Sequence, residues 1–186
     1  MLLGTLLQCC NPLECSCSVV YLLMQLPRGA TEIHHEVELG VVIGSTACCV
    51  SESAAADHIG GYVLGLDMTD REAQTQAKKS RLPWTLAKSF DTSCPVSRFI
   101  EMSSVADPHD VELWLTVNGV TRQCASTSDL IFSIPYLISW ISHHMTLELG
   151  DLILTGTPAG VGPVRAGDRI ECGISNLVTM AFEVER

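Results

Sequence analysis

Short stretches of alternating or apolar residues, separated by turn residues, run along most of the chain and predict a β-rich fold. Residues 35–44 alternate and then turn apolar, as a strand does when it enters a core. Residues 62–68 predict a second strand, and residues 152–154, 169–172 and 177–184 predict three more. Because these strands are short and joined by turns, the pattern favours a closed or rolled, antiparallel-rich sheet with a few covering helices, an α+β class.

One hairpin and two helices are also predicted. Asn118-Gly119 separates two strand-like runs, residues 111–117 and 120–123, and Asn-Gly is typical of a two-residue type I′ turn. Residues 53–58 form a short Ala-rich helix candidate that ends at a pair of glycines. Residues 70–79 are polar and helix-favouring, and a Leu-Pro pair stops them.

A third and longer helix is predicted over residues 126–144. Isoleucines recur there at steps of three and four residues, and Pro135 is expected to kink or restart the helix. The isoleucines are Ile131, Ile134, Ile138 and Ile141.

The composition changes near Arg28, which suggests two parts. Residues 1–30 are apolar and Cys-rich without a clear period, and residues 31–186 are expected to form one catalytic-size domain. No Lys or Arg precedes Arg28, so no recognisable targeting peptide is predicted. The apolar runs are also shorter than the ~20 residues that cross a bilayer, so we expect no membrane partner.

Charge and cysteine content narrow the function. The 186 residues carry a formal net charge of -10, which argues against nucleic acid or an anionic membrane as the main partner. The 9 cysteines are odd in number and irregularly spaced, and they fit no zinc template. We expect reduced thiols in an intracellular protein, and we interpret Cys94, which has no base at a fixed spacing, as a packing residue.

Three carboxylates are candidate metal ligands. Glu36 and Glu38 share one face of a predicted strand, because side chains at i and i+2 point to the same side. Two carboxylates this close repel by about 4 kcal/mol at an effective dielectric near 20, and a divalent cation removes that cost. Asp67 ends the next strand and would supply a third hard oxygen for Mg²⁺. The alternatives are a solvated strand face for the Glu pair and a helix N-cap for Asp67.

Other candidates surround these acids. Lys88 lies among apolar residues, either as a cation that stabilises an anionic intermediate or as a surface lysine with a buried stem. Residues 155–163 form a Gly- and Pro-rich loop, either a ligand-binding backbone or a tight turn. The six histidines show no metal spacing, although His34 and His35 precede the Glu pair and are candidates to support it.

The order of these features resembles the fumarylacetoacetate hydrolase family. The resemblance covers 156 of the 186 residues and rests on five specific segments: residues 34–42, 60–74, 82–95, 131–139 and 150–158. It implies a mixed β-roll, barrel-like domain with flanking helices, usually a homodimer. It also implies a mitochondrial or cytoplasmic location.

The same resemblance implies a function and a set of site residues. It implies Mg²⁺, or alternatively Mn²⁺, bound by Glu36, Glu38 and Asp67. Lys88 would be the catalytic residue, and the substrate contacts would be Arg71, Gln74 and Thr157. The implied reaction is metal-dependent cleavage of small 2-oxo acids through an enolate, as acylpyruvate hydrolysis, oxaloacetate decarboxylation or both.

The family also carries an upstream His-x-x-Glu lid dyad that residues 1–30 do not match, since they contain no histidine. One alternative is therefore a catalytically impaired form that retains the metal-binding domain. Loss of a general acid–base pair costs roughly 10²- to 10⁴-fold in rate. Another alternative is a generic β-rich binding module, which requires the carboxylates to face solvent.

Overall fold

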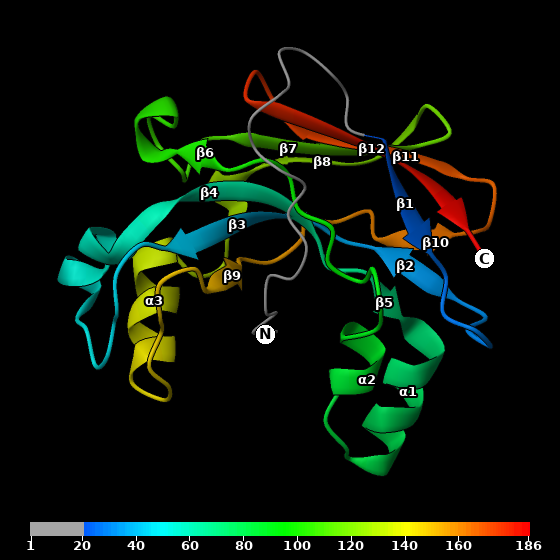
Figure 1. The fold of residues 1–186 in the computed structure, drawn as a ribbon, viewed down its shortest axis with the longest axis horizontal. Coiled ribbons are helices and arrows are strands. Elements are labelled where there is room, and N and C mark those ends of the chain that lie inside the picture. Colours follow the sequence, from blue (N-terminus) through cyan, green and yellow to red (C-terminus); the bar gives the residue numbers. More distant parts are fainter. Residues whose placement is uncertain (1–20) are drawn as a thin grey trace.

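Residues 21–186 are described by a computed structural model, in which three sheets surround one core (Figure 1). The largest sheet has the strand order β1 (Tyr21–Gln25), β12 (Val178–Glu185), β11 (Arg169–Ile174), β7 (Glu112–Val117) and β8 (Val120–Ser126). The second has the order β6 (Ile100–Glu101), β4 (Ile59–Leu66), β3 (Val37–Ile43) and β9 (Leu152–Leu154). The third has the order β10 (Gly162–Val164), β2 (Ile33–His35) and β5 (Thr69–Asp70).

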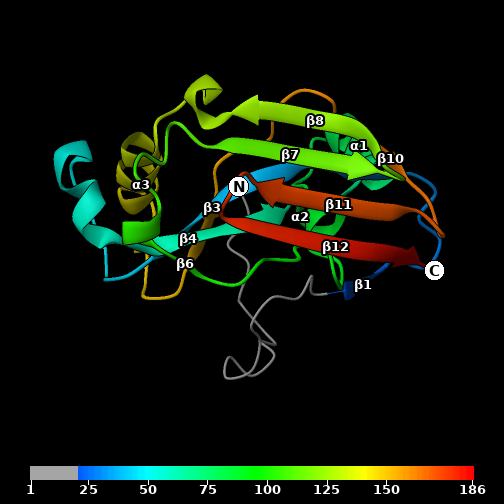
Figure 2. The same ribbon diagram turned by 90° about the horizontal axis from the view of Figure 1, so that it is seen from above.

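The large sheet lies over the β3–β4 pair, and the core fills the space between them (Figures 1 and 2). Fully buried side chains come from both layers, with Leu39 and Leu64 on one side and Leu115, Ile170 and Phe182 on the other. All pairings among the described strands are antiparallel except that of β1 with β12. The β-rich α+β class is therefore confirmed, although no barrel closes within residues 21–186.

Helices cover the two ends of this framework. α1 (Arg71–Ser80) and α2 (Thr85–Lys88) pack together beside β5, and α3 (Ile134–Ser142) packs against the 3₁₀ helix η1 (Glu52–His58) at the opposite end (Figure 1). Two further 3₁₀ turns are η2 (Met102–Ser104) and η3 (Thr127–Asp129). None of the described helices is long and apolar enough to cross a membrane.

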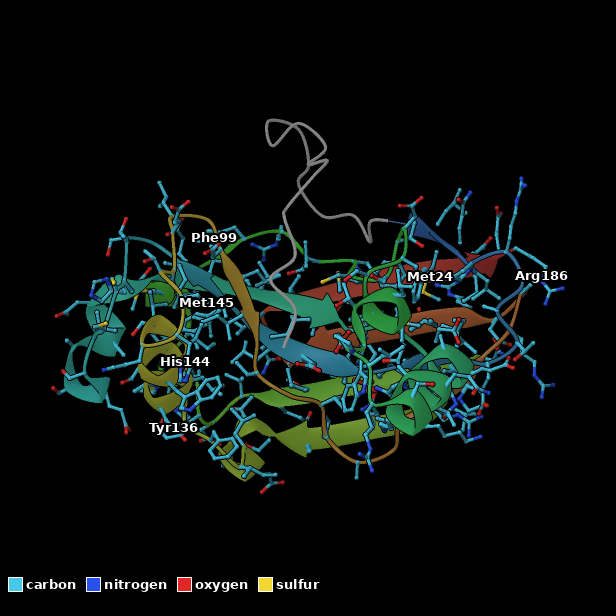
Figure 3. The ribbon with its side chains drawn as sticks, turned by 90° about the horizontal axis from the view of Figure 1, so that it is seen from below. Met24, Phe99, Tyr136, His144, Met145 and Arg186 are labelled. Atoms are coloured by element: carbon cyan, nitrogen blue, oxygen red, sulfur yellow. The ribbon has the colours of Figure 1, made fainter. Side chains whose placement is uncertain are left out.

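The predicted helix over residues 126–144 was too long. The α-helix begins only after Ser133, whose hydroxyl accepts a hydrogen bond from the Tyr136 N–H, and Pro135 lies in its first turn. Pro fits there because the first helical N–H groups have no intrahelical partner. The helix buries Ile134, Ile138 and Ile141, whereas Ile131 lies before the helix and is 90% exposed. Tyr136 stacks on Phe132, and Trp140 stacks on His144 just after the helix ends (Figure 3).

One strand prediction was wrong in its continuity, whereas the hairpin prediction was right. The strand predicted over residues 35–44 is divided into β2 and β3, with Glu36 at the break. The predicted hairpin is confirmed as β7–β8, and its turn has positive φ at both Asn118 (51°) and Gly119 (75°). The proposed boundary at residue 30 stays a prediction: β1 pairs with β12, and residues 1–20 lie outside the described part of the chain.

Candidate metal centre and substrate cavity

Three carboxylates from two paired strands converge in the structure. Glu36 lies at the break before β3, Glu38 lies on β3, and Asp67 follows the last residue of β4. One oxygen of each lies within 4.8 Å of one oxygen of the other two. The antiparallel register explains this, since the Asp67 N–H donates to the Glu36 carbonyl at 2.9 Å across the strand ends. Asp70, rather than Asp67, caps helix α1.

These carboxylates are enclosed rather than solvated. Glu36 and Glu38 are 7% and 4% exposed, which excludes the solvated strand face and with it the generic binding module. Burial is the main cause that raises the pKa of Glu38 to about 7; the Gly156 N–H, which donates to it at 2.6 Å, opposes the shift, and repulsion from Asp67 and Glu36 adds to it. Burial also raises the pKa of Asp67.

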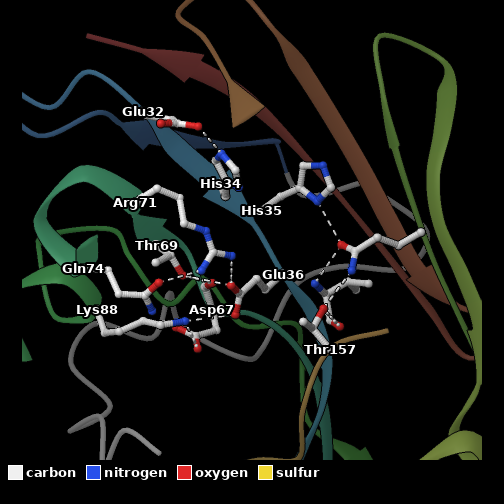
Figure 4. Close-up of polar contacts among 12 residues, drawn as sticks. Glu32, His34, His35, Glu36, Asp67, Thr69, Arg71, Gln74, Lys88 and Thr157 are labelled. Carbon is white, nitrogen blue, oxygen red and sulfur yellow. Dashed lines mark hydrogen bonds and ion pairs between the residues drawn. The ribbon is translucent and has the colours of Figure 1, made fainter. Parts of the chain in front are cut away.

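Two cations lie against the cluster. The Lys88 ammonium donates to Glu36 at 2.9 Å and to Asp67 at 2.6 Å, and Arg71 is paired with the other Glu36 oxygen (Figure 4). The Lys88 side chain is 11% exposed, so it is not a surface lysine. Gln74 accepts from the Arg71 guanidinium at 3.0 Å. Two positive charges thus face three carboxylates, and hard oxygen donors with surplus negative charge suit a divalent cation.

A cavity of about 690 Å³ opens beside this cluster. One edge of its lining is hydrophobic and includes Trp84. The Lys78 ammonium lies 4.8 Å from the centre of the Trp84 ring. The lining residues are Glu36, Asp67, Arg71, Gln74, Lys78, Leu82, Pro83, Trp84, Thr85, Lys88 and Ser89. Five of the seven predicted site residues therefore share one cavity, together with Lys78 and Trp84, which no sequence feature marked.

Glu38 and Thr157 do not line this cavity. Glu38 belongs to the carboxylate cluster but points to the loop after β9, where it meets Gly156. The Thr157 hydroxyl donates to the Val37 carbonyl at 2.9 Å and accepts from the buried amide of Gln123 at 2.8 Å (Figure 4). No local sequence signal marks Gln123, because its hydrogen-bond partners lie far along the chain.

The other candidates are not ligands in this arrangement. His34 pairs with Glu32 at 2.9 Å, away from the carboxylates. His35 is fully buried and bonds to Gln123 at 2.8 Å, and burial lowers its pKa. Burial raises the pKa of Cys94 to about 11, so its thiol is protonated at neutral pH, in agreement with a packing role.

The fold and the site define a class of protein. It is a β-rich α+β domain in which a buried cluster of carboxylates lies beside a cavity lined in part by Lys and Arg side chains. The family model described as "Fumarylacetoacetate (FAA) hydrolase C-terminal" matches residues 19–185, and the chain belongs to this family.

Named relatives agree with this assignment. The chain is 56% identical over 161 residues to human "Oxaloacetate tautomerase FAHD1, mitochondrial", covering 87% of this chain and 73% of the relative. The Arabidopsis thaliana protein of the same name is 54% identical over 163 residues, covering 88% and 73%.

Solved structures show the same fold. A fumarylpyruvate hydrolase from Pseudomonas aeruginosa, in complex with Mn²⁺ and pyruvate, superposes with a TM-score of 0.86 at 34% identity, covering 89% of this chain and 71% of that one. A putative fumarylpyruvate hydrolase from Burkholderia cenocepacia also gives a TM-score of 0.86, at 38% identity, covering 90% and 75%.

Proposed function

We propose that this protein is an enzyme that acts on small 2-oxo acids, of the oxaloacetate or acylpyruvate type, through an enolate, and that it requires a divalent cation. The observation that carries the proposal is the convergence of Glu36, Glu38 and Asp67 beside Lys88 and Arg71 at one cavity. Tautomerisation, decarboxylation and acylpyruvate hydrolysis of such acids all pass through an enol or enolate. One arrangement of charges therefore serves each reaction.

The relatives support this substrate class. Two are named oxaloacetate tautomerases, and a structural neighbour is a fumarylpyruvate hydrolase with bound Mn²⁺ and pyruvate. Oxaloacetate and pyruvate are both 2-oxo acids. We therefore place oxaloacetate first among the substrates to be tested, with acylpyruvates second.

The proposed metal ligands are the three converging carboxylates, Glu36, Glu38 and Asp67. They fit a hard divalent cation, because they offer three carboxylate oxygens within 4.8 Å of one another and because the burial of like charges is unfavourable without a cation. When bound, Mg²⁺ or Mn²⁺ would act as a Lewis acid toward the carboxylate and 2-oxo oxygens of the substrate.

Charge balance shows what the protein side chains add. Glu36, Glu38 and Asp67 carry three negative charges, and Lys88 and Arg71 carry two positive charges. A divalent cation brings the sum to plus one, which attracts a carboxylate substrate despite the net charge of -10 for the whole chain.

Within this site the side chains have separate roles. Lys88 donates through its ammonium to the oxygen on which enolate charge develops, and its contacts with Glu36 and Asp67 hold it in place. Arg71 and Gln74, which bond to each other at the cavity wall, bind the substrate carboxylate. Thr157 is proposed to contact the substrate from the loop after β9.

The test is turnover of oxaloacetate by the whole chain with Mg²⁺ or Mn²⁺ and with a chelator. We expect metal-dependent conversion between enol and keto forms, or loss of CO₂, above the rate of the same metal in solution. Lys88→Met should lower that rate by about 10²- to 10³-fold. Lys79→Met, a change of the same kind at an exposed position of α1, should leave it unchanged.

Absence of any metal-dependent rate above background, for oxaloacetate and for an acylpyruvate, would refute the enzymatic proposal. If the chain then still binds Mn²⁺ at a single site, and this binding is lost in a Glu36→Ala, Glu38→Ala variant, the catalytically impaired alternative is correct. If it binds no divalent cation, the metal site falls as well.

We also propose a mitochondrial location, because the named relatives are mitochondrial proteins, and a homodimeric state. Fractionation of cells that express the full chain tests the location. Light scattering during size exclusion tests the dimer, which should elute at twice the mass of the chain.

A further inference from the structure

Gln123 on β8 is a fully buried amide with four hydrogen bonds to two other segments. Its oxygen accepts from the Val37 N–H at 3.2 Å and is 2.8 Å from Nδ1 of His35. Its nitrogen donates to the Thr157 hydroxyl at 2.8 Å and to the Pro158 carbonyl at 2.9 Å. This one side chain therefore joins the strand that carries the glutamates to the loop after β9.

The orientation of this amide is fixed from both sides. The Pro158 carbonyl can only accept, so the amide nitrogen must face it, and the Val37 N–H can only donate, so the amide oxygen must face that group. It follows that His35 carries its proton on Nδ1 and donates to the same oxygen. All four hydrogen-bonding positions of the Gln123 amide are used, and a flipped amide would lose at least two of them.

Together, Gln123 and Thr157 occupy both peptide groups of Val37. The amide oxygen accepts from the Val37 N–H, and the Thr157 hydroxyl donates to the Val37 carbonyl at 2.9 Å. On this edge of β3 the neighbouring strand β9 pairs only with Gly40–Val42. The two side chains thus replace a missing strand beside Val37, which is the residue between Glu36 and Glu38.

The loop that carries Thr157 is itself held close to β8. Gly160 has φ of +101°, and a Cβ there would lie 1.8 Å from the Arg122 carbonyl oxygen. The same loop reaches the carboxylate cluster, since the Gly156 N–H donates to Glu38 at 2.6 Å. The position of the loop against Gln123 is therefore coupled to the orientation of a carboxylate in the cluster.

We propose that Gln123 is a positioning residue for the metal ligands: its amide, acting with the Thr157 hydroxyl, fixes the Val37 peptide groups from which Glu36 and Glu38 project. The inference rests on the proposed metal site and adds to it a buried residue that touches no carboxylate. Its physical basis is that a multidentate site binds tightly only when its ligands are held in place before the ion arrives.

The decisive variant is Gln123→Met, which keeps the length of the side chain, adds no charge and removes all four bonds. The readout is the Kd for Mn²⁺, measured by electron paramagnetic resonance well below the melting temperature of each variant. We expect Mn²⁺ affinity to fall by about 10- to 100-fold. Gln25→Met, at an exposed position of β1 whose hydrogen bonds with the Thr92 hydroxyl involve only the Gln25 backbone, should match the parent.

A second pair of variants covers the case in which Gln123→Met does not fold. Thr157→Val removes only the hydroxyl and should weaken Mn²⁺ binding in the same direction, while Thr157→Ser restores the hydroxyl and should bind within about twofold of the parent. A folded Gln123→Met or Thr157→Val chain with the parental Kd overturns the inference, even if its melting temperature has dropped, because the amide would then only support the fold. A parent that binds no Mn²⁺ instead removes the proposed metal site, and the inference with it.

Discussion

At the scale of single residues, Glu38 is expected to oppose stability while it serves metal binding. Its carboxylate is 4% exposed and lies beside two others, so its ionised form is costly without a cation. Glu38→Gln keeps an oxygen that can accept from the Gly156 N–H. We expect this variant to lose at least about 100-fold in Mn²⁺ affinity, yet to melt several degrees higher than the parent in chelator at pH 8.

Calorimetry for the metal and thermal melts for stability provide both measurements. Glu52→Gln, the same change at an exposed position of η1, controls for the altered net charge. A Glu38→Gln chain that binds metal as the parent does would show that this carboxylate is not a ligand. A lower melting temperature would show that its charge is already balanced.

The dependence of stability on pH follows from the same residue. The ordinary pKa of a glutamate is 4.5, and burial raises the pKa of Glu38 to about 7 in the folded chain. A raised carboxyl pKa means that the folded state binds the proton more tightly, so this stabilisation is full below pH 4.5 and is lost as the pH rises through 7. We expect the metal-free parent to lose several degrees of melting temperature relative to Glu38→Gln between pH 5 and 8.

Melts of both chains in chelator at unit steps of pH give the measurement, because the difference between them cancels other titrating groups. Saturating Mg²⁺ should reverse the trend, since the metal binds the deprotonated form. If the melting temperatures of the two chains change with pH in parallel across this range, the raised pKa of Glu38 would be contradicted.

The sequence predicted the acids better than the residues that position them. Glu36 and Glu38 follow from two-residue spacing on a strand, and Asp67 from its place at a strand end. Gln123 bonds to Val37 and Thr157, which lie 86 and 34 residues away. Side-chain periodicity reports only whether a position faces inward, so the partners of a buried amide emerge only from the assembled fold.

At the scale of elements, two glycines are expected to matter for different reasons. Gly119 has φ of +75° and open space where a Cβ would be, so Gly119→Ala should cost only the backbone strain, about 1 kcal/mol. A Cβ on Gly60 would lie 2.9 Å from the Gly44 Cα, where the ends of β3 and β4 meet. Gly60→Ala should therefore cost more, about 2–3 kcal/mol, because backbone must move.

Urea unfolding of the two alanine variants beside the parent measures both costs. The order of the two effects is the sharp part of this prediction. If Gly119→Ala is the more damaging change, then the β7–β8 turn contributes more to stability than the close contact between β3 and β4.

The predicted boundaries of two elements were wrong, because hydrophobic periodicity was outweighed there by a helix cap or by an ion pair. The isoleucine period over residues 126–144 predicts a helix, but Ser133 and Pro135 together are a helix start, with a hydroxyl cap followed by a proline in the first turn. The strand over residues 35–44 was predicted as continuous. In the structure the strand is interrupted at Glu36, whose carboxylate is paired with Arg71 and Lys88. An ion-paired residue at a strand break leaves no mark in hydrophobic periodicity.

At the scale of the whole molecule, the β-rich class followed from the sequence but the arrangement of the sheets did not. The number of short strands and the Asn-Gly turn are local properties. The parallel pairing of β1 with β12 joins residues near opposite ends of the described chain, and β2 is paired with β10 and β5 rather than with β3, which follows it. Such choices depend on which apolar faces cover one another, and one sequence alone does not reveal them.

The carboxylates and cations of the site are expected to respond to ligands as one charged unit. Without a cation the cluster of three carboxylates and two cations carries a surplus negative charge, so oxalate, a dianion that resembles the pyruvate enolate, should not raise the melting temperature by itself. Mg²⁺ alone should raise it by a few degrees, and it changes the sign of the local charge. Mg²⁺ and oxalate together should then stabilise by more than the sum of their separate effects, because each ligand improves the site for the other.

Lys88→Met should retain the effect of Mg²⁺ and lose most of the added effect of oxalate, whereas Lys79→Met should keep both. Simple additivity in the parent would mean that the two ligands bind at separate places, and the enolate site inferred from this cavity would have to be abandoned.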